Sequence, residues 1–386
     1  MKTYEGRKKK YALAKKIACA VLLLSSLFLL TSAGTAGVAL KIKAGGKEYL
    51  FYPAEIGYAG GKAFLKKEEN VLHGIYLDTV TLPADARAIF TPLKKEPFSY
   101  ETEKKGKGID EKKLFRDVRA ALNGGERVVK CAFIDLYPSV TVQQLKRETQ
   151  FVAFFSTEYG SSSAARKNNV AAAARAIGGR MLLPGEEFSF NRAVGKRSEE
   201  NGYLPAKIIE NGKFADGIGG GVCQVSSTLY NAALISGLTV TERHRHSLSV
   251  SYVEPSFDAM VSDAGADLKF RNDGKTPVYF GAFADGERIA FTFYGEKGAY
   301  EYRRQSYVIR YIDPPKEETI GCGELAGGES REIVKAKKGI VSEGFLETYE
   351  NGKLICRKAL GKDIYAPLRG IRLIGIKGSF AGGEQP

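Results

Sequence analysis

The feature that most restricts this chain is an uncharged, largely apolar segment near its N-terminus, Ile17–Leu40. It exceeds the roughly 20 residues that a helix needs to cross a hydrocarbon core. Two basic clusters, Arg7–Lys10 and Lys15-Lys16, precede it, and positive charge marks the cytosolic side of a membrane span. We therefore expect residues 1–16 to be a cytosolic basic tail, residues 17–40 to be a transmembrane anchor, and the rest to lie outside the membrane.

A cleaved signal peptide is the alternative for the same segment, because Thr31-Ser32-Ala33 offers the small residues of a cleavage site. Both interpretations export the protein, either as a single-pass membrane protein with an extracytoplasmic body or as a secreted one. Nucleic acid is then not an expected partner. The formal net charge of +14 instead favours an anionic wall polymer or the membrane surface.

The body of the chain has the pattern of an α+β protein with more than one domain. Its 386 residues allow two or three cores. Residues 41–150 mix strand-like runs with a charged helix, residues 151–296 are rich in Gly, Ser and Ala, and residues 297–386 form a small β-rich region with frequent turn signals.

Three helices are predicted by apolar spacing and end signals. Asp110 caps a helix that runs to about Leu122, Ser163–Ile177 is an alanine-rich helix, and Val222–Ile235 is a helix that follows Gly219–Gly221 and ends before Gly237. The third helix begins directly after a glycine loop, which makes this junction the most informative part of the sequence.

Strands are predicted by alternation of side chains. Residues 243–252 alternate so that His244 and His246 share the apolar face, toward a core or a cleft floor. Runs at 277–283 and 288–294 meet at Asp285-Gly286, and a hairpin is expected around Asn351-Gly352.

The cysteines give little sign of a metal site or a disulfide framework. Outside the apolar segment stand Cys131, Cys223, Cys322 and Cys356, without a CxxC pair or zinc-like spacing. Cys322 and Cys356 could form a disulfide in an oxidising compartment, and all except Cys223 are equally consistent with small buried hydrophobic residues.

Cys223 differs because it stands at the expected start of a helix. A thiol reacts as thiolate, and a helix N-terminus supplies partial positive charge and free N–H groups that favour the anion. Gly220 and Gly221 allow close approach of a substrate backbone, and Gln224, Ser226 and Ser227 supply polar groups nearby. This combination suits acyl transfer, in which N–H groups stabilise an oxyanion.

A cysteine nucleophile also needs a base, and histidine is its usual partner. His244 and His246 are the candidates, with Asp258 or Asp267 to orient the imidazole. The alternative is purely structural, with a packed cysteine, hydrogen-bonded core histidines and a tight glycine turn. A metal site of Cys223, His244 and His246 is weakly supported because the spacing matches no metal motif, so no metal and no cofactor are expected.

A long run of residues in this region resembles the VanW family. The matching segments are Phe155-Ser156-Thr157, Arg166, Asn168-Asn169, Leu183 to Asn191, Gly202-Tyr203, Gly219 to Ala232, and Glu242-Arg243 with His246-Ser247. The similarity extends through most of residues 151–296. Residues from about Asp85 to Ser156 resemble the peptidoglycan-binding domain that commonly precedes a VanW domain, so residues 41–150 are expected to be that domain and residues 151–296 the VanW domain.

The resemblance implies a bacterial envelope protein of a family first associated with glycopeptide resistance, some members of which act as cysteine L,D-transpeptidases on peptidoglycan stem peptides. Carried over, Cys223 is the nucleophile and His246 the better-matched base, with His244 ranked second. Arg243 is suited to bind a carboxylate. The family usually has a proline and a glycine between its tyrosine and Asp-Ala, whereas this chain reads Tyr252-Val253-Glu254-Pro255-Ser256-Phe257-Asp258-Ala259, so the loop near the site departs from the family pattern.

Two functions are consistent with these observations. The first is a thiol acyltransferase that acts on stem peptides, and the second is a non-catalytic accessory protein that binds peptidoglycan or wall polymer.

Overall fold

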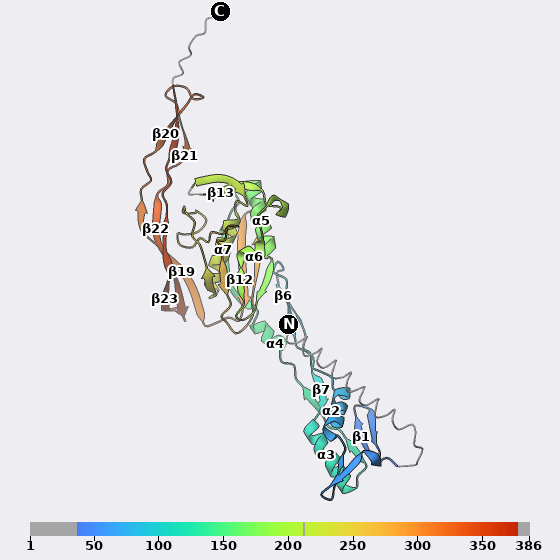
Figure 1. Cartoon of the computed structure of the whole chain (residues 1–386). Helices are drawn as coiled ribbons and strands as arrows, with labels where there is room; N and C mark the ends of the chain where they lie inside the picture. The colour runs from blue at the N-terminus through green and yellow to red at the C-terminus, as the bar shows by residue number, and fades with distance from the viewer. Residues whose placement is uncertain (1–36, 211–212, 377–386) are drawn as a thin grey trace, which may run out of the picture. The chain divides into compact units, whose positions relative to one another are not determined.

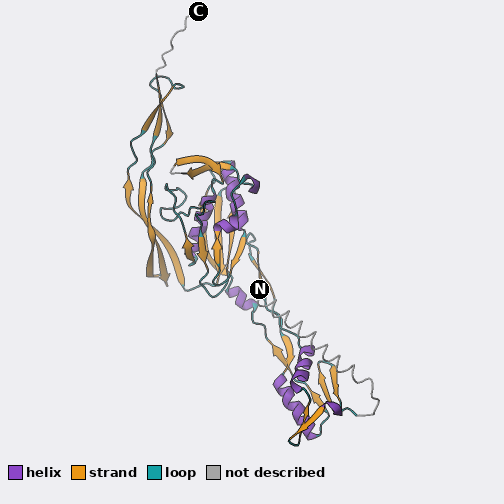
Figure 2. Cartoon of the chain, viewed as in Figure 1, coloured by secondary structure: helices purple, strands orange, loops and turns teal. Residues whose placement is uncertain are grey.

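The computed structural model describes residues 37–210 and 213–376. The predicted anchor lies outside these residues except for its end, where Leu40 is the first residue of a strand and is fully buried. Among the described residues, no helix is both long enough and apolar enough to span a membrane. The fold is a mixture of α and β structure in which strands predominate (Figure 2).

Two compact units make up the chain, the first from residues up to Ala88 and from Tyr100–Leu145, the second from Ile89–Ser99 and Lys146 onward. The elements of the first unit, with the hairpin and helix at its boundaries, are β1 (Leu40–Ala44), β2 (Lys47–Phe51), η1 (Pro53–Glu55), β3 (Ile56–Ala59), β4 (Lys62–Leu65), α2 (Glu68–Thr79), β5 (Arg87–Phe90), β6 (Phe98–Glu101), β7 (Gly106–Ile109), α3 (Glu111–Gly124), β8 (Val128–Lys130), β9 (Phe133–Leu136) and α4 (Val142–Arg147).

The first unit encloses its own core between a three-stranded sheet, β2-β1-β8, and the helices α2 and α3. Ile42 of β1, Leu72 of α2 and Val118 of α3 are fully buried there. The predicted helix at 110–122 is confirmed, since the Asp110 carboxylate accepts a hydrogen bond from the Lys113 N–H and caps α3.

The second unit holds the region of the glycine-rich junction. Its elements are β10 (Gln150–Glu158), α5 (Ala164–Ile177), β11 (Gly179–Leu182), β12 (Glu187–Ser189), α6 (Phe190–Val194), η2 (Glu199–Asn201), β13 (Pro205–Glu210), β14 (Lys213–Ile218), α7 (Val222–Ile235), β15 (Thr239–Glu242), β16 (Lys269–Arg271), β17 (Val278–Ala284), β18 (Arg288–Gly295), β19 (Tyr300–Ile312), β20 (Glu318–Cys322), β21 (Ser330–Val334), β22 (Gly339–Glu350), β23 (Lys353–Tyr365) and β24 (Ile371–Gly375). The predicted helices at 163–177 and 222–235, the strands around Asp285-Gly286 and the hairpin at Asn351-Gly352 are confirmed.

An antiparallel sheet, β10-β18-β17-β11, is the centre of this unit, and α5 and α7 pack against it (Figure 1). Buried aromatic rings fill the space beside the sheet. Phe280 of β17 stacks on Phe293 at 4.9 Å between ring centroids and meets Phe188 edge-on at 5.3 Å. Aromatic pairs of this kind add to the burial of their apolar surface.

Helix α7 is buried almost all round, although its sequence contains many polar residues. Their side chains bond backbone carbonyls inside the core: Ser227 donates to the Cys223 carbonyl, Thr228 to that of Gln224, and Asn231 to that of Ser227. Because these polar groups have hydrogen-bond partners, the helix can lie in the core without an unpaired donor.

The C-terminal strands form two sheets, β19-β22-β23 and β20-β24-β21, and belong to the second unit. Strand β19 contacts α7, and its Arg304 guanidinium lies over the rings of Phe155 and Phe257 at 4.5 and 4.6 Å. The same guanidinium donates to the side-chain oxygen of Asn231. The β-rich region is therefore attached to the core that holds α7.

One predicted strand and one possible disulfide are absent from the described chain. Residues 243–252 are not a strand: β15 ends at Glu242, and beyond it His244 forms only an isolated bridge with Met260. The backbone N–H of His246 donates to the Asp258 carboxylate, which takes the place of a strand partner. Cys322 and Cys356 are free thiols and form no disulfide.

The aromatic cluster should dominate the stability of the second unit. Replacing Phe280 with Ala removes a fully buried ring and should lower the free energy of unfolding by about 3–5 kcal/mol. Phe283 lies on the same strand and is 46% exposed, so Phe283→Ala should cost far less. Urea unfolding of both variants tests this, and equal losses would contradict the packing.

Candidate active site

The loop before α7 is built from glycine for steric reasons that the structure makes explicit. Gly219 and Gly221 have left-handed backbones, with φ of 83° and 106°. A Cβ on Gly220 would lie 2.7 Å from the Lys207 carbonyl oxygen, and one on Gly221 would lie 2.9 Å from Cγ of Arg166. The glycines thus make room for β13 and α5.

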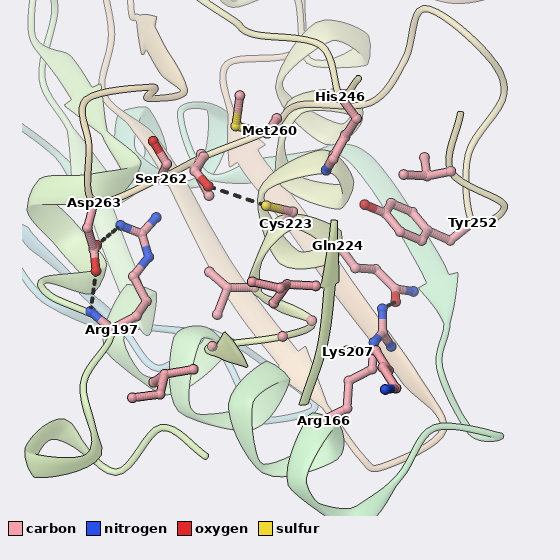
Figure 3. Close-up of a pocket in the computed structure, with 18 of the residues that line it drawn as sticks. Arg166, Arg197, Lys207, Cys223, Gln224, His246, Tyr252, Met260, Ser262 and Asp263 are labelled. Atoms are coloured by element: carbon pink, nitrogen blue, oxygen red, sulfur yellow. Dashed lines mark hydrogen bonds and ion pairs between the residues drawn. The ribbon is translucent and has the colours of Figure 1, made fainter. Parts of the chain in front are cut away.

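Cys223 is the second residue of α7 and is half-buried. Its Sγ lies 3.4 Å from the carbonyl oxygen of Val261. His246 is the partner that lowers the pKa of its thiol, and the imidazole points toward the sulfur (Figure 3). The position at the start of a buried helix places the sulfur near positive backbone charge.

The orientation of His246 is set by Asp258. The imidazole Nδ1 lies 2.6 Å from Asp258 Oδ2, and the His246 backbone N–H donates to the same oxygen at 2.7 Å. With Nδ1 occupied, Nε2 is the nitrogen that faces Cys223. His246 is 5% exposed and Asp258 is 1% exposed. Cysteine, imidazole and carboxylate therefore stand in the order that nucleophilic catalysis requires.

Asp258 is itself held by groups from distant parts of the chain. Its Oδ1 accepts hydrogen bonds from the Arg243 guanidinium at 2.8 Å and from the Tyr365 hydroxyl at 2.5 Å. Arg243 also binds both carboxylate oxygens of Asp363, at 2.9 and 2.8 Å. Strand β23 of the C-terminal region thus contributes two side chains that fix the carboxylate behind His246.

Burial and charge shift the pKa values of these groups in complementary directions. Burial raises the pKa of the Cys223 thiol, but the hydrogen bond and charge of His246 outweigh it and leave that pKa below its usual value. Burial lowers the pKa of His246, yet the bonds to Asp258 and Cys223 raise it to about 9. Burial raises the pKa of Asp258, whereas His246 and Arg243 bring it down to about 2. Each charge stabilises the other, so the thiolate forms more readily beside the imidazolium than in an isolated cysteine.

The sulfur opens into a cavity of about 750 Å³, a size typical of ligand sites. Figure 3 shows most of the side chains that surround it. The lining residues are Arg166, Arg197, Lys207, Ile208, Ile218, Gly219 to Gln224, His246, Ser249 to Tyr252, Met260 to Ala264, and Lys337. Of the residues expected in a site, Gly220, Gly221, Cys223, Gln224 and His246 line this cavity.

Ser226 and Ser227 do not line the cavity and act beneath it instead. Both are fully buried: Ser226 donates to the Ala259 carbonyl at 2.6 Å, and the Ala259 N–H donates to Ser227 Oγ at 2.9 Å. They hold the backbone next to Asp258. Gln224 is fixed by Thr157 and by the Glu158 carbonyl, and its Oε1 accepts from Arg166 at 2.8 Å.

His244, Arg243 and Asp267 lie away from the thiol. The His244 side chain is 44% exposed and lies 2.9 Å from Glu242, so the alternation that placed both histidines on one buried face is wrong for this one. The Arg243 guanidinium is committed to Asp258 and Asp363. Asp267 binds Ser189 and the Asn191 N–H, which leaves Asp258 as the carboxylate behind His246.

Several residues that line the cavity or hold Asp258 were not predicted from the sequence to belong to the site. Arg166 stood among the family-like residues, but nothing in its local pattern indicated that it lines the same cavity as Cys223. Tyr252 was expected on a strand, and its ring borders the cavity (Figure 3). Lys337 and Tyr365 lie more than a hundred residues downstream, and no local periodicity connects them with α7.

The family resemblance is confirmed over the domain that contains this site. Residues 165–294 match the family described as VanW like protein. The chain is 38% identical over 171 residues to the uncharacterized protein YoaR of Bacillus subtilis (strain 168), a match that covers 44% of this chain and 56% of that protein. It is 28% identical over 222 residues to the vancomycin B-type resistance protein VanW of Enterococcus faecalis (strain ATCC 700802 / V583), which covers 52% of this chain and 80% of that protein.

Solved structures give only a distant likeness. The G5 domain of IgA1 protease matches 20% of this chain and 92% of its own, with 24% identity and a TM-score of 0.15. The HP0197-G5 structure matches 20% of this chain and 100% of its own, with 18% identity and a TM-score of 0.12. The peptidoglycan-binding domain expected before the VanW domain stays a prediction.

The thiolate character of Cys223 should depend on His246 and not on His244. Replacing His246 with Ala should slow alkylation of Cys223 by iodoacetamide at pH 7 by about tenfold or more, because each unit of pKa changes the thiolate fraction tenfold. Peptide mass spectrometry measures the rate at this cysteine alone. His244→Ala is the matched control, and an equal effect there would exclude the pairing.

The raised pKa of His246 should depend on Asp258. In Asp258→Asn the carboxylate charge is lost, so the pKa should fall well below about 9. The chain has three histidines, and an NMR titration of their ring protons follows each one. Asp267→Asn removes the other candidate carboxylate and should leave His246 unchanged. An unchanged titration in Asp258→Asn would show that this carboxylate does not control the base.

Proposed function

We propose, because residues 165–294 form a VanW domain, that this chain is a cell-envelope protein that acts on peptidoglycan as a cysteine L,D-transpeptidase. The observation that carries the proposal is that His246 lies between Cys223 and Asp258 and that Cys223 lines the cavity. A half-buried thiol with a lowered pKa, a paired imidazole and an orienting carboxylate are together the requirements of a thiol acyltransferase.

In the first half-reaction the Cys223 thiolate attacks the carbonyl carbon before the terminal D-alanine of a stem peptide. A C–S bond forms, and the oxyanion accepts a hydrogen bond from the backbone N–H of Cys223 at the start of α7. Such donors are worth about 3–4 kcal/mol each. The C–N bond then breaks, the His246 imidazolium gives its proton to the leaving amine, and D-alanine departs to leave a thioester.

In the second half-reaction neutral His246 takes a proton from the amine of a neighbouring stem peptide as that amine attacks the thioester. The new C–N bond forms, the C–S bond breaks, and the thiolate and imidazolium are restored. Water in place of the amine gives hydrolysis. No cofactor takes part in either step.

The surroundings of the chain follow from the same proposal. The basic residues before the apolar N-terminal segment favour an extracytoplasmic body, held at the membrane by an anchor or released after cleavage. The name of the Enterococcus relative refers to vancomycin resistance, which concerns an antibiotic directed at the cell wall. Stem peptides, anionic wall polymer and the membrane are the partners we propose.

Non-catalytic binding of wall material is the second candidate, and the net charge of +14 favours it. Binding of this kind would rely on exposed basic groups and would weaken with salt. It would not require the thiol.

Replacing Cys223 with Ala should abolish both the acyl adduct on the protein and new cross-links between stem peptides. Intact-protein mass spectrometry after incubation with a stem tetrapeptide detects the adduct, and muropeptide chromatography detects the cross-links. Cys356→Ala removes an exposed thiol and should change neither. The rate should fall as the pH rises past about 9, where His246 loses its proton. Unchanged cross-linking in Cys223→Ala would leave the binding function.

A further inference from the structure

Two positively charged side chains of the cavity have no negatively charged partner in the described part of the chain. Arg166 of α5 donates to Ser162 Oγ at 2.7 Å and to Gln224 Oε1 at 2.8 Å, both neutral. Lys337, between β21 and β22, donates to the Ser249 carbonyl at 2.5 Å. Within residues 37–210 and 213–376, neither forms an ion pair with a carboxylate.

The other two basic residues of the lining are already neutralised. Arg197 is paired with Asp263, and Lys207 lies 2.9 Å from Asp216. The contrast matters because a cation that loses part of its hydration without a counter-ion costs free energy. Burial lowers the pKa of both Arg166 and Lys337, as expected for charges that lack a partner.

We infer, on the basis of the proposed acyl transfer, that Arg166 and Lys337 bind two carboxylates of the acyl-donor peptide. Arg166 takes the C-terminal carboxylate of the leaving residue, and Lys337 takes a free carboxylate farther along the peptide. The ligand of this cavity is thus an anionic peptide with a free C-terminus one residue beyond the scissile bond.

The position of Arg166 fits the C-terminal carboxylate. Gln224, which accepts its hydrogen bond, is next to Cys223 in the chain, and the charges of Arg166 and Cys223 interact. In a donor with one residue after the scissile bond, the terminal carboxylate is only three bonds from the attacked carbonyl carbon, so its receptor must lie close to the sulfur. Figure 3 shows the link between Arg166 and Gln224 on the cavity side of α7.

The shape of the two groups supports the division of roles. Two of the five N–H groups of Arg166 donate to protein atoms, and the planar fork suits both oxygens of a carboxylate. Lys337 offers a compact charge with rotatable donors, which suits a carboxylate that is placed less strictly. Thr157 and Glu158 of β10 fix Gln224, and Gln224 in turn fixes the guanidinium.

Binding is tested in the full chain with Cys223→Ala, so that no chemistry occurs. Calorimetry compares a stem tetrapeptide that ends in D-alanine with the same peptide as its C-terminal amide. The amide should bind about 10- to 100-fold more weakly, as expected for loss of a charged hydrogen-bond partner. In Arg166→Gln this difference should disappear, whereas Arg175→Gln, an exposed arginine on the same helix, should retain it.

A second set of comparisons varies the length and the charge of the peptide. A pentapeptide moves the terminal carboxylate one residue away, so it should bind more weakly than the tetrapeptide, and Arg166→Lys, which keeps the charge, should preserve part of the preference. For Lys337, amidation of the upstream carboxylate should weaken binding, and Lys337→Gln should remove that effect while Lys207→Gln does not. If the protein with Arg166→Gln and the protein that keeps Arg166 distinguish the tetrapeptide from its C-terminal amide equally well, the inference is overturned.

The proposed function is judged separately, by the acyl adduct on intact Cys223. If the adduct forms but the preference for a free terminal carboxylate does not depend on Arg166, the inference is overturned and the proposed transferase function stands. The coupling without an adduct would leave an anionic-peptide site on a protein that performs no acyl transfer.

Discussion

The negative charge of Asp258 is the constraint on which the site depends. A carboxylate that is 1% exposed is tolerated in a protein interior only when it is paired and hydrogen-bonded. Asp258 meets this condition with the imidazole and backbone of His246, the guanidinium of Arg243 and the hydroxyl of Tyr365. The same bonds orient the ring that faces Cys223, so the stability of the buried charge and the geometry of the thiol pair have one physical origin.

Helix α7 is the second support, and its polar residues explain how it works. Ser226 and Ser227 bind the backbone of Ala259, the neighbour of Asp258, while the start of the helix carries Cys223. The positions of Cys223 and Asp258 are therefore both set by one buried helix, α7. The sequence predicted that Ser226 and Ser227 contact substrate, but they hold the backbone beside Asp258. Arg166, Tyr252 and Lys337 line the cavity.

The elements near Cys223 could be predicted because their signals are local. Three glycines followed by a helical run identify the start of α7, and the glycine turn at Asp285-Gly286 identifies β17 and β18. The alternation of side chains could not show which histidine is buried beside Cys223, because His246 is held there by Asp258 across an irregular loop. Only the family resemblance favoured His246 over His244 as the base. Asp363, Tyr365 and Lys337 reach the site through long-range packing of the C-terminal strands, for which no short motif exists.

The anchoring of Asp258 by Tyr365 and Asp363 has a consequence for the order of events during synthesis. Strand β23 lies near the end of the described chain, so it is made long after α7. Until that strand docks, Asp258 lacks the Tyr365 hydroxyl and Arg243 lacks one of its two carboxylates, and the imidazole that activates the thiol has no fixed direction. In a chain whose strand β23 has not yet docked, Cys223 therefore lacks the oriented imidazole beside it, and the pairing of thiol and imidazole depends on completion of the fold.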